Sequence, residues 1–79
     1  MKITIEFYGK LKAEFSEHPI EWQSDAVTVN DIYHQLCKQH QKQPNTQVIK
    51  PIINDSFCDW QQVVNDGDVI GFFPPASGG

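Results

Sequence analysis

The chain has 79 residues, 39% of them hydrophobic, and a formal net charge of −4 with six lysines and no arginine. This length fits one small domain without a large internal active-site cavity, and the acidic balance argues against nucleic-acid binding. No apolar run reaches the ~20 residues of a membrane helix. There is no secretory signal pattern and the two cysteines show no staple spacing, so we expect the reducing cytoplasm.

The N-terminal part of the chain predicts two strands joined by a long loop. Residues 2–8 alternate between apolar and polar side chains, which is typical of a half-buried strand. The apolar positions are Ile3, Ile5 and Phe7. Residues 9–12 break the pattern and predict a turn. Residues 17–22 predict a weaker second strand, and Pro19 favours an edge position for it.

Residues 25–40 change to the period of a helix. Apolar side chains recur at i, i+3, i+4, i+7 and i+8, which predicts an amphipathic helix of about three turns. These positions are Val29, Ile32, Tyr33, Leu36 and Cys37. Thr28 is followed three residues later by Asp31, which resembles a capping box with Asp in place of the usual Glu or Gln. The helix is therefore expected to begin close to Thr28.

The second half of the chain predicts further strands. Residues 48–54 form a third strand, in which Pro51 indicates a bulge or an edge position, and residues 57–60 form a short fourth strand. An Asp-Gly turn then leads into residues 69–73. This last strand is apolar on both faces, as expected for a central strand lying parallel to the first.

Together these elements predict an α+β fold, a mixed sheet of four to five strands packed over one main helix. We expect a single domain over residues 1–75, followed by a flexible tail over residues 76–79. Pro74 and Pro75 end the sheet because proline lacks a backbone donor. The four residues after them are small and reach roughly 13 Å when extended, which suits insertion into a narrow site. An inert flexible terminus has the same composition, so the tail alone leaves both interpretations open.

The last strand also predicts a contact surface. Because side chains alternate along a strand, Phe72 and Phe73 point to opposite faces. If Phe72 faces the helix, Phe73 is an outward aromatic at the base of the tail, which suits it to anchor a partner.

The rest of the sequence contains no pattern for catalysis or for metal binding. His34 and His40 are six residues apart, so they do not share a helix face as i, i+4 ligands would. Two cysteines are too few for a four-cysteine iron–sulfur cluster. Gly67 and Gly71 mark a turn and a strand and do not form a phosphate loop. We expect this chain to bind no metal or cofactor and any catalytic groups to lie on a partner.

The C-terminal sequence resembles the small subunit of molybdopterin synthase, a family of ubiquitin-like sulfur carriers in molybdenum-cofactor biosynthesis. The matching segments are Asp66-Gly67-Asp68, Phe72-Phe73-Pro74-Pro75, Gly78-Gly79 and the turn at Ile53-Asn54. The match covers nearly the whole chain in length and element order and is most specific over about the last fourteen residues. One departure is the first loop, where Lys10 and Lys12 stand in a segment that commonly contains arginine in the family.

The resemblance implies a β-grasp fold and a route for sulfur transfer. A separate activating enzyme, using ATP and Mg, would adenylate the Gly79 carboxylate, and a sulfur donor system would convert it to a thiocarboxylate. The tail would then insert into the large subunit of molybdopterin synthase, with the two subunits forming a heterotetramer, and deliver sulfur to a pterin precursor. The tail residues are Ala76, Ser77 and Gly78, and the implied partner-binding residues are Phe7, Phe73, Pro74 and Pro75.

Other functions stay open at this point. A carrier of the thiazole pathway and a ubiquitin-related modifier share the Gly-Gly end and the acyl-adenylate chemistry, although the Phe-Phe-Pro-Pro stem favours the molybdopterin branch. A different class is an interaction module with an inert tail, for which loss of Gly79 would change nothing.

Overall fold

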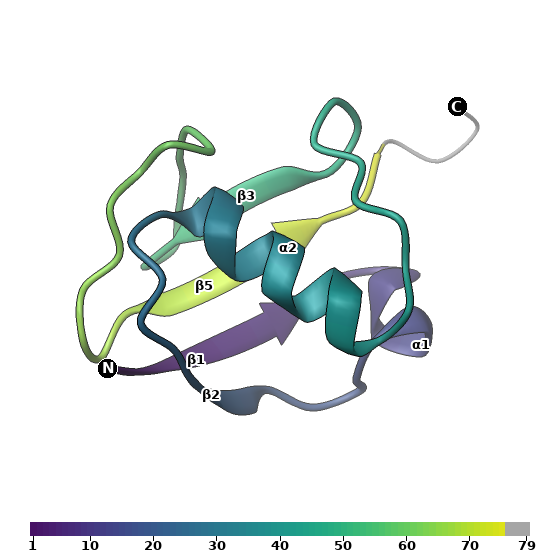
Figure 1. Cartoon of the computed structure of the whole chain (residues 1–79). Coiled ribbons are helices and arrows are strands. Elements are labelled where there is room, and N and C mark those ends of the chain that lie inside the picture. Colours follow the sequence, from purple (N-terminus) through teal and green to yellow (C-terminus); the bar gives the residue numbers. More distant parts are fainter. Residues whose placement is uncertain (76–79) are drawn as a thin grey trace.

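The computed structural model describes residues 1–75 and contains a five-stranded mixed sheet with one long helix across one face (Figure 1). The elements in chain order are β1 (Lys2–Phe7), α1 (Leu11–Glu14), β2 (Ile20–Gln23), α2 (Val29–Gln39), β3 (Lys50–Ile53), β4 (Ser56–Phe57) and β5 (Val69–Phe73). The strand order across the sheet is β2-β1-β5-β3-β4. This is the predicted architecture of a mixed sheet over one main helix.

Strand β5 occupies the middle of the sheet. It pairs parallel with β1 and antiparallel with β3, while β2 pairs antiparallel with the other side of β1. Ile70, Gly71 and Phe72 are buried in this central strand, which explains most of its apolar sequence. β5 ends on the side of the molecule opposite residue 1, so the residues that follow leave the sheet there (Figure 1).

Helix α2 begins at the predicted capping box. The hydroxyl of Thr28 accepts a hydrogen bond from the backbone N–H of Asp31 at 3.2 Å, and the Asp31 carboxylate accepts one from the N–H of Thr28 at 3.4 Å. These bonds satisfy donors that the first turn leaves free. The whole apolar stripe of the helix is buried, so α2 packs through it against the sheet.

The core lies between α2 and the face of the sheet that we call the inner face. The inner-face residues of the two central strands are all at most 4% exposed: Ile3, Ile5, Phe7, Ile70 and Phe72. The parallel register sets Ile5 beside Ile70 and Phe7 beside Phe72. The opposite face, the outer face, carries the alternate residues of the same strands.

Local details differ from the prediction around the first two strands. Residues 11–14 form the short helix α1 where a turn was expected. β2 starts only at Ile20, because the chain before it bends on itself. The Ser16 hydroxyl accepts from the N–H of His18 at 3.2 Å and donates to the His18 carbonyl at 2.7 Å, which keeps these groups out of a strand ladder. β2 is an edge strand, as Pro19 predicts.

Pro51 is not at a sheet edge, because β3 lies between β5 and β4. The Pro51 carbonyl accepts a hydrogen bond from the N–H of Cys58 at 3.1 Å, on the β4 side. In a strand the N and O of one residue point the same way, so the missing donor also faces the β4 side. β4 contains two residues, Ser56 and Phe57, and the pairing of β3 with β5 therefore loses no hydrogen bond.

Within residues 1–75, no helix has the length and apolar character required to cross a membrane.

Candidate functional site

The candidate site is the end of β5, from which the chain leaves the sheet. Phe72 is 1% exposed and Phe73 is 42% exposed, so the side chains of these two neighbours point to opposite faces of the sheet. The outward orientation expected for Phe73 is confirmed. The predicted tail residues lie outside the described part of the chain: Ala76, Ser77, Gly78 and Gly79.

Phe73 belongs to an exposed cluster that we call the aromatic patch, defined as Tyr8, Phe57 and Phe73. The rings of Tyr8 and Phe73 stack with centroids 5.4 Å apart and planes 27° from parallel. Phe57, which is 68% exposed, meets Phe73 edge-on at 5.9 Å. Large aromatic side chains grouped on a surface are typical of protein docking sites, because they bury much apolar area when a partner covers them.

Gly71 makes room for the Tyr8 ring on the outer face. A Cβ at this position would lie 2.9 Å from Cε2 of Tyr8 and 3.6 Å from Cβ of Ile52. The missing side chain therefore allows the Tyr8 ring to lie against β5 and reach Phe73.

The Tyr8 hydroxyl also has a polar partner. It donates a hydrogen bond to the Glu6 carboxylate at 3.3 Å. Burial of the phenol raises the pKa of Tyr8, and the negative charge of Glu6 adds to the rise. Tyr8 is therefore a neutral hydrogen-bond donor at physiological pH.

The loop after β1 supports the base of the tail. Gly9 has a φ of +54°, a value that favours glycine, and a Cβ there would lie 2.9 Å from Cγ of Pro74. The backbone of this loop thus packs directly against the Pro74 ring. Pro74 and Pro75 are both half-buried against their own domain. Their docking to a partner stays a prediction.

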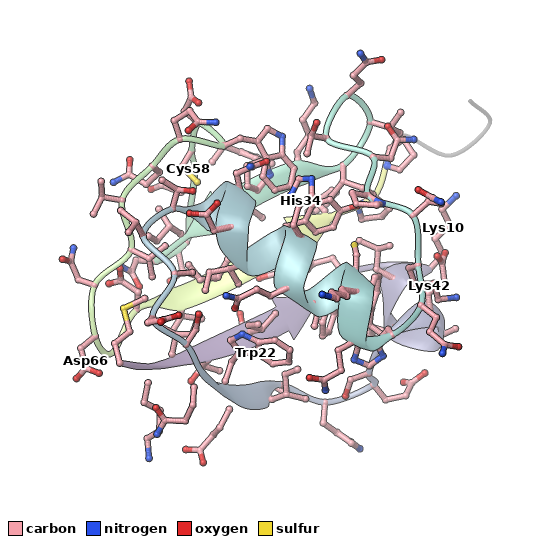
Figure 2. All side chains as sticks on the ribbon, viewed as in Figure 1. Lys10, Trp22, His34, Lys42, Cys58 and Asp66 are labelled. Carbon is pink, nitrogen blue, oxygen red and sulfur yellow. The ribbon has the colours of Figure 1, made fainter. Side chains whose placement is uncertain are left out.

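A cavity of about 270 Å³ lies beside Pro75 and is lined by Lys10 and Lys42 among other residues. Its apolar lining includes Leu11 and Phe15. Figure 2 shows Lys10 and Lys42 on the same side of the molecule as the end of β5. Two ammonium groups and the carboxylate of Glu14 therefore line the cavity beside the base of the tail. The ammonium groups act as point charges and lack the planar fork of a guanidinium.

Phe7 does not belong to the exposed site, and we correct its assignment to partner binding. Its side chain is 4% exposed, stacks on Phe15 at 5.1 Å and lies 6.3 Å from the ring of Phe72. The alternation of β1 directs Phe7 to the inner face, so it has no surface to offer a partner. The next residue, Tyr8, is the one that reaches the outer face.

Sequence reasoning missed two of the three residues of the aromatic patch. Tyr8 had a usable signal, since it follows Phe7 at the end of an alternating strand. Phe57 had none, because its position depends on the pairing of β4 with β3, which sets Phe57 beside Ile52.

Neither cysteine belongs to the aromatic patch, and both are poor nucleophiles. Cys37 is buried in α2 and Cys58 is half-buried after β4. Burial raises the pKa of both thiols, so neither favours the reactive thiolate at neutral pH. In the part of the chain that the structure covers, no group of three His, Cys, Asp or Glu side chains is arranged to hold a metal ion.

Comparison with known proteins identifies relatives of this chain. Residues 5–79 match the protein-family model described as "ThiS family". No curated protein matches the chain. SAMP1 from Haloferax volcanii has a similar structure, with a TM-score of 0.80, 19% identity and 100% of both chains covered.

Two similar structures are molybdopterin converting factors. A putative subunit 1 from Pyrococcus furiosus has a TM-score of 0.78 and 19% identity, with 95% of this chain and 98% of that chain covered. A structure of the complex of subunits 1 and 2 from Helicobacter pylori matches with a TM-score of 0.60 and 24% identity over 100% of both chains. At these identities the likeness establishes the ubiquitin-like β-grasp fold. Since the family match covers nearly the whole chain, this protein belongs to the ThiS family, which confirms the predicted resemblance to the ubiquitin-like sulfur carriers.

Proposed function

We propose that this chain carries sulfur on its C-terminal Gly79. The observation that carries the proposal is the anchored end of β5. Phe73 lies there in an exposed aromatic patch. The Pro74 ring packs so closely against Gly9 that Gly9 has no room for a Cβ. The small residues after Pro75 thus start from a fixed base beside a surface that suits a partner. Such a geometry fits a tail that enters the active site of another protein.

The proposed chemistry needs an activating enzyme, because a carboxylate is a poor electrophile. A Gly79 carboxylate oxygen attacks the α-phosphorus of ATP, and pyrophosphate leaves with Mg as its counter-ion. The resulting acyl-adenylate has AMP as a good leaving group. Sulfide from a donor system then attacks the acyl carbon, the bond to AMP breaks, and the thiocarboxylate, AMP and a proton are formed. Ala76, Ser77 and Gly78 form the slim segment that passes into the partner. A carrier that depends on ATP in this way is expected in the cytoplasm.

Among sulfur carriers we favour the molybdopterin branch. The Phe72-Phe73-Pro74-Pro75 stem supports it, as does the structural similarity to a putative molybdopterin converting factor subunit 1. The partner would then be the large subunit of molybdopterin synthase, in a heterotetramer, and the acceptor a pterin precursor. The similar Helicobacter pylori protein is described in complex with its subunit 2, which supports a protein partner for this chain.

A second candidate is a ubiquitin-like protein modifier. The match to SAMP1, for which another structure is described as small archaeal modifier protein 1, has a higher TM-score than the match to the converting-factor complex, 0.80 against 0.60. A modifier would end in an isopeptide bond to lysine instead of a sulfur transfer. A carrier of the thiazole pathway remains a third candidate, on the strength of the family match.

The proposal is tested with two variants of the tail, one lacking Gly79 and one with an alanine added after it. Each is combined with the activating enzyme, the sulfur donor and the large synthase subunit of the same organism, and pterin product is measured. We expect no product from either variant and an unchanged free energy of unfolding. Full activity of either variant would contradict the carrier mechanism. Lysine conjugates in place of pterin product would identify the modifier.

A further inference from the structure

A second cavity adjoins the aromatic patch on the outer face. It measures about 200 Å³, and its lining includes Glu6 of β1, Tyr8 just after β1, Lys12 of α1, and Glu17 and His18 of the loop before β2. Tyr8 belongs both to this lining and to the aromatic patch. A partner that covers the patch up to Tyr8 therefore also borders this cavity.

The cavity carries a surplus of negative charge. Within residues 1–75 the one ion pair closer than 4.0 Å joins Lys2 and Glu21, so neither Glu6 nor Glu17 has a cation at that distance. Lys12 lines the same cavity and can balance either Glu6 or Glu17. The two carboxylates and this ammonium group then leave one negative charge in excess. The Tyr8 hydroxyl donates to one oxygen of Glu6 and supplies no charge.

A docking partner has to compensate for this charge. Covering a carboxylate removes its water, which is unfavourable unless the interface supplies a cation with good hydrogen-bond geometry. Arginine is the side chain best suited to this cavity, because its planar guanidinium binds carboxylates through two hydrogen bonds and also packs well against aromatic rings.

We propose that the cavity between Glu6 and Glu17 receives an arginine side chain of the partner protein that docks on the aromatic patch. The inference rests on the proposed function, since it assumes that a partner covers the outer face. The inference adds that the docking surface of the partner is apolar and is flanked by one arginine.

The first test is a titration of the isotope-labelled chain with N-acetyl-arginine amide, followed by NMR. Acetyl-citrulline amide, which has a similar shape and no charge, is the matched ligand. We expect saturable shifts of the backbone amides of Glu6, Tyr8 and Glu17 with the arginine compound and none with the citrulline compound. Equal responses to both compounds, or no response at these amides, would overturn the proposal.

Charge variants sharpen the same titration. Glu6→Gln and Glu17→Gln should each weaken binding of the arginine compound at least threefold, and Lys12→Gln should strengthen it because a competing cation is lost. Asp25→Asn is the control, since Asp25 is exposed in the loop before α2 and lines neither cavity. An unchanged affinity in Glu17→Gln, a loop residue whose substitution leaves the core intact, would contradict the proposal even if Glu6→Gln failed to fold.

The final arm uses the purified partner, the large synthase subunit. Calorimetry should show about tenfold weaker binding for Glu6→Gln and no change for Asp25→Asn. This outcome is independent of sulfur loading, which is measured as a mass gain at Gly79. If Glu6→Gln bound the partner as tightly as the wild type while sulfur loading was normal, only the proposed arginine site would be overturned. A normal arginine response without sulfur loading would overturn only the proposed function.

Discussion

The inner and outer faces of the sheet use the same strands for different purposes, and the contrast is sharpest at the end of β5. On the inner face Phe72 lies 5.1 Å from the ring of Tyr33 and 6.0 Å from that of Trp60, fully covered. On the outer face its neighbour Phe73 contacts the two other rings of the aromatic patch and stays 42% exposed.

The difference in exposure between Phe72 and Phe73 decides whether burial of the side chain stabilises the fold or a complex. The apolar area of Phe72 is already removed from water, so it stabilises the fold. Much of the area of Phe73 is still in water and becomes available only when a partner covers it. Substitutions at the two positions should therefore separate stability from binding.

The largest effect is expected for Phe72→Ala. Loss of a buried phenylalanine and the cavity that it leaves cost about 3–5 kcal/mol of unfolding free energy, a large share of the ~5–15 kcal/mol typical of a domain. Urea denaturation measures the loss, with Phe57→Ala as the control, because Phe57 is 68% exposed and should change the value by less than about 1 kcal/mol. Equal losses in both variants would remove the distinction between the two faces.

The next effect is a dependence of the unfolding free energy on pH, caused by Tyr33 in the core. Burial raises the pKa of Tyr33 to about 12, although its hydroxyl accepts a hydrogen bond from the N–H of Asn45 at 3.0 Å. In the unfolded chain the pKa is about 10, so between about pH 10 and 12 the unfolded state loses a proton that the folded state keeps. The contribution of this group to the free energy of unfolding is complete below pH ~10 and should decrease as the pH rises towards ~12.

This pH dependence is measured by urea denaturation of the wild type and of Tyr33→Phe across the alkaline range. The variant lacks the titrating group, so its stability should fall less steeply with pH than that of the wild type. Parallel profiles for the two proteins would show that Tyr33 is not the source of the dependence.

On the outer face, Phe73→Ala should weaken partner binding by about 2 kcal/mol, or roughly 30-fold, as expected for an aromatic anchor. The unfolding free energy should change by less than about 1 kcal/mol, because the side chain is partly in water already. Val27→Ala is the matched control, since Val27 is 60% exposed and lies before α2, away from the patch. A large stability loss in Phe73→Ala would mean that Phe73 belongs to the core.

The smallest effect is expected for Gly71→Ala. The added Cβ would meet Cε2 of Tyr8 at 2.9 Å, and the ring can yield because it is the far end of a side chain. We expect a loss of about 1 kcal/mol or less in stability and a fewfold loss in partner binding. In a Tyr8→Ala background the effect on binding should disappear, because the two residues act through one contact. A persistent effect would mean that Gly71 acts through the backbone.

Features set by local pattern could be predicted from the sequence. The bounds of β5, the capping box of α2 and the opposite orientations of Phe72 and Phe73 each depend on residues close together in the chain. Features set by pairing between distant segments could not. Phe57 reaches the aromatic patch through β4, and Pro51 is tolerated because of the side on which β4 lies, and neither fact has a local signature.

The central claim is that Gly79 carries sulfur, and intact mass spectrometry tests it most directly. The chain is incubated with ATP, Mg, the activating enzyme and a sulfur donor, and fragmentation then locates any change. The account predicts a mass gain that corresponds to one oxygen replaced by sulfur, located at Gly79. An unchanged mass, with partners that load a known carrier in the same reaction, would contradict the claim and leave this protein as a binding module.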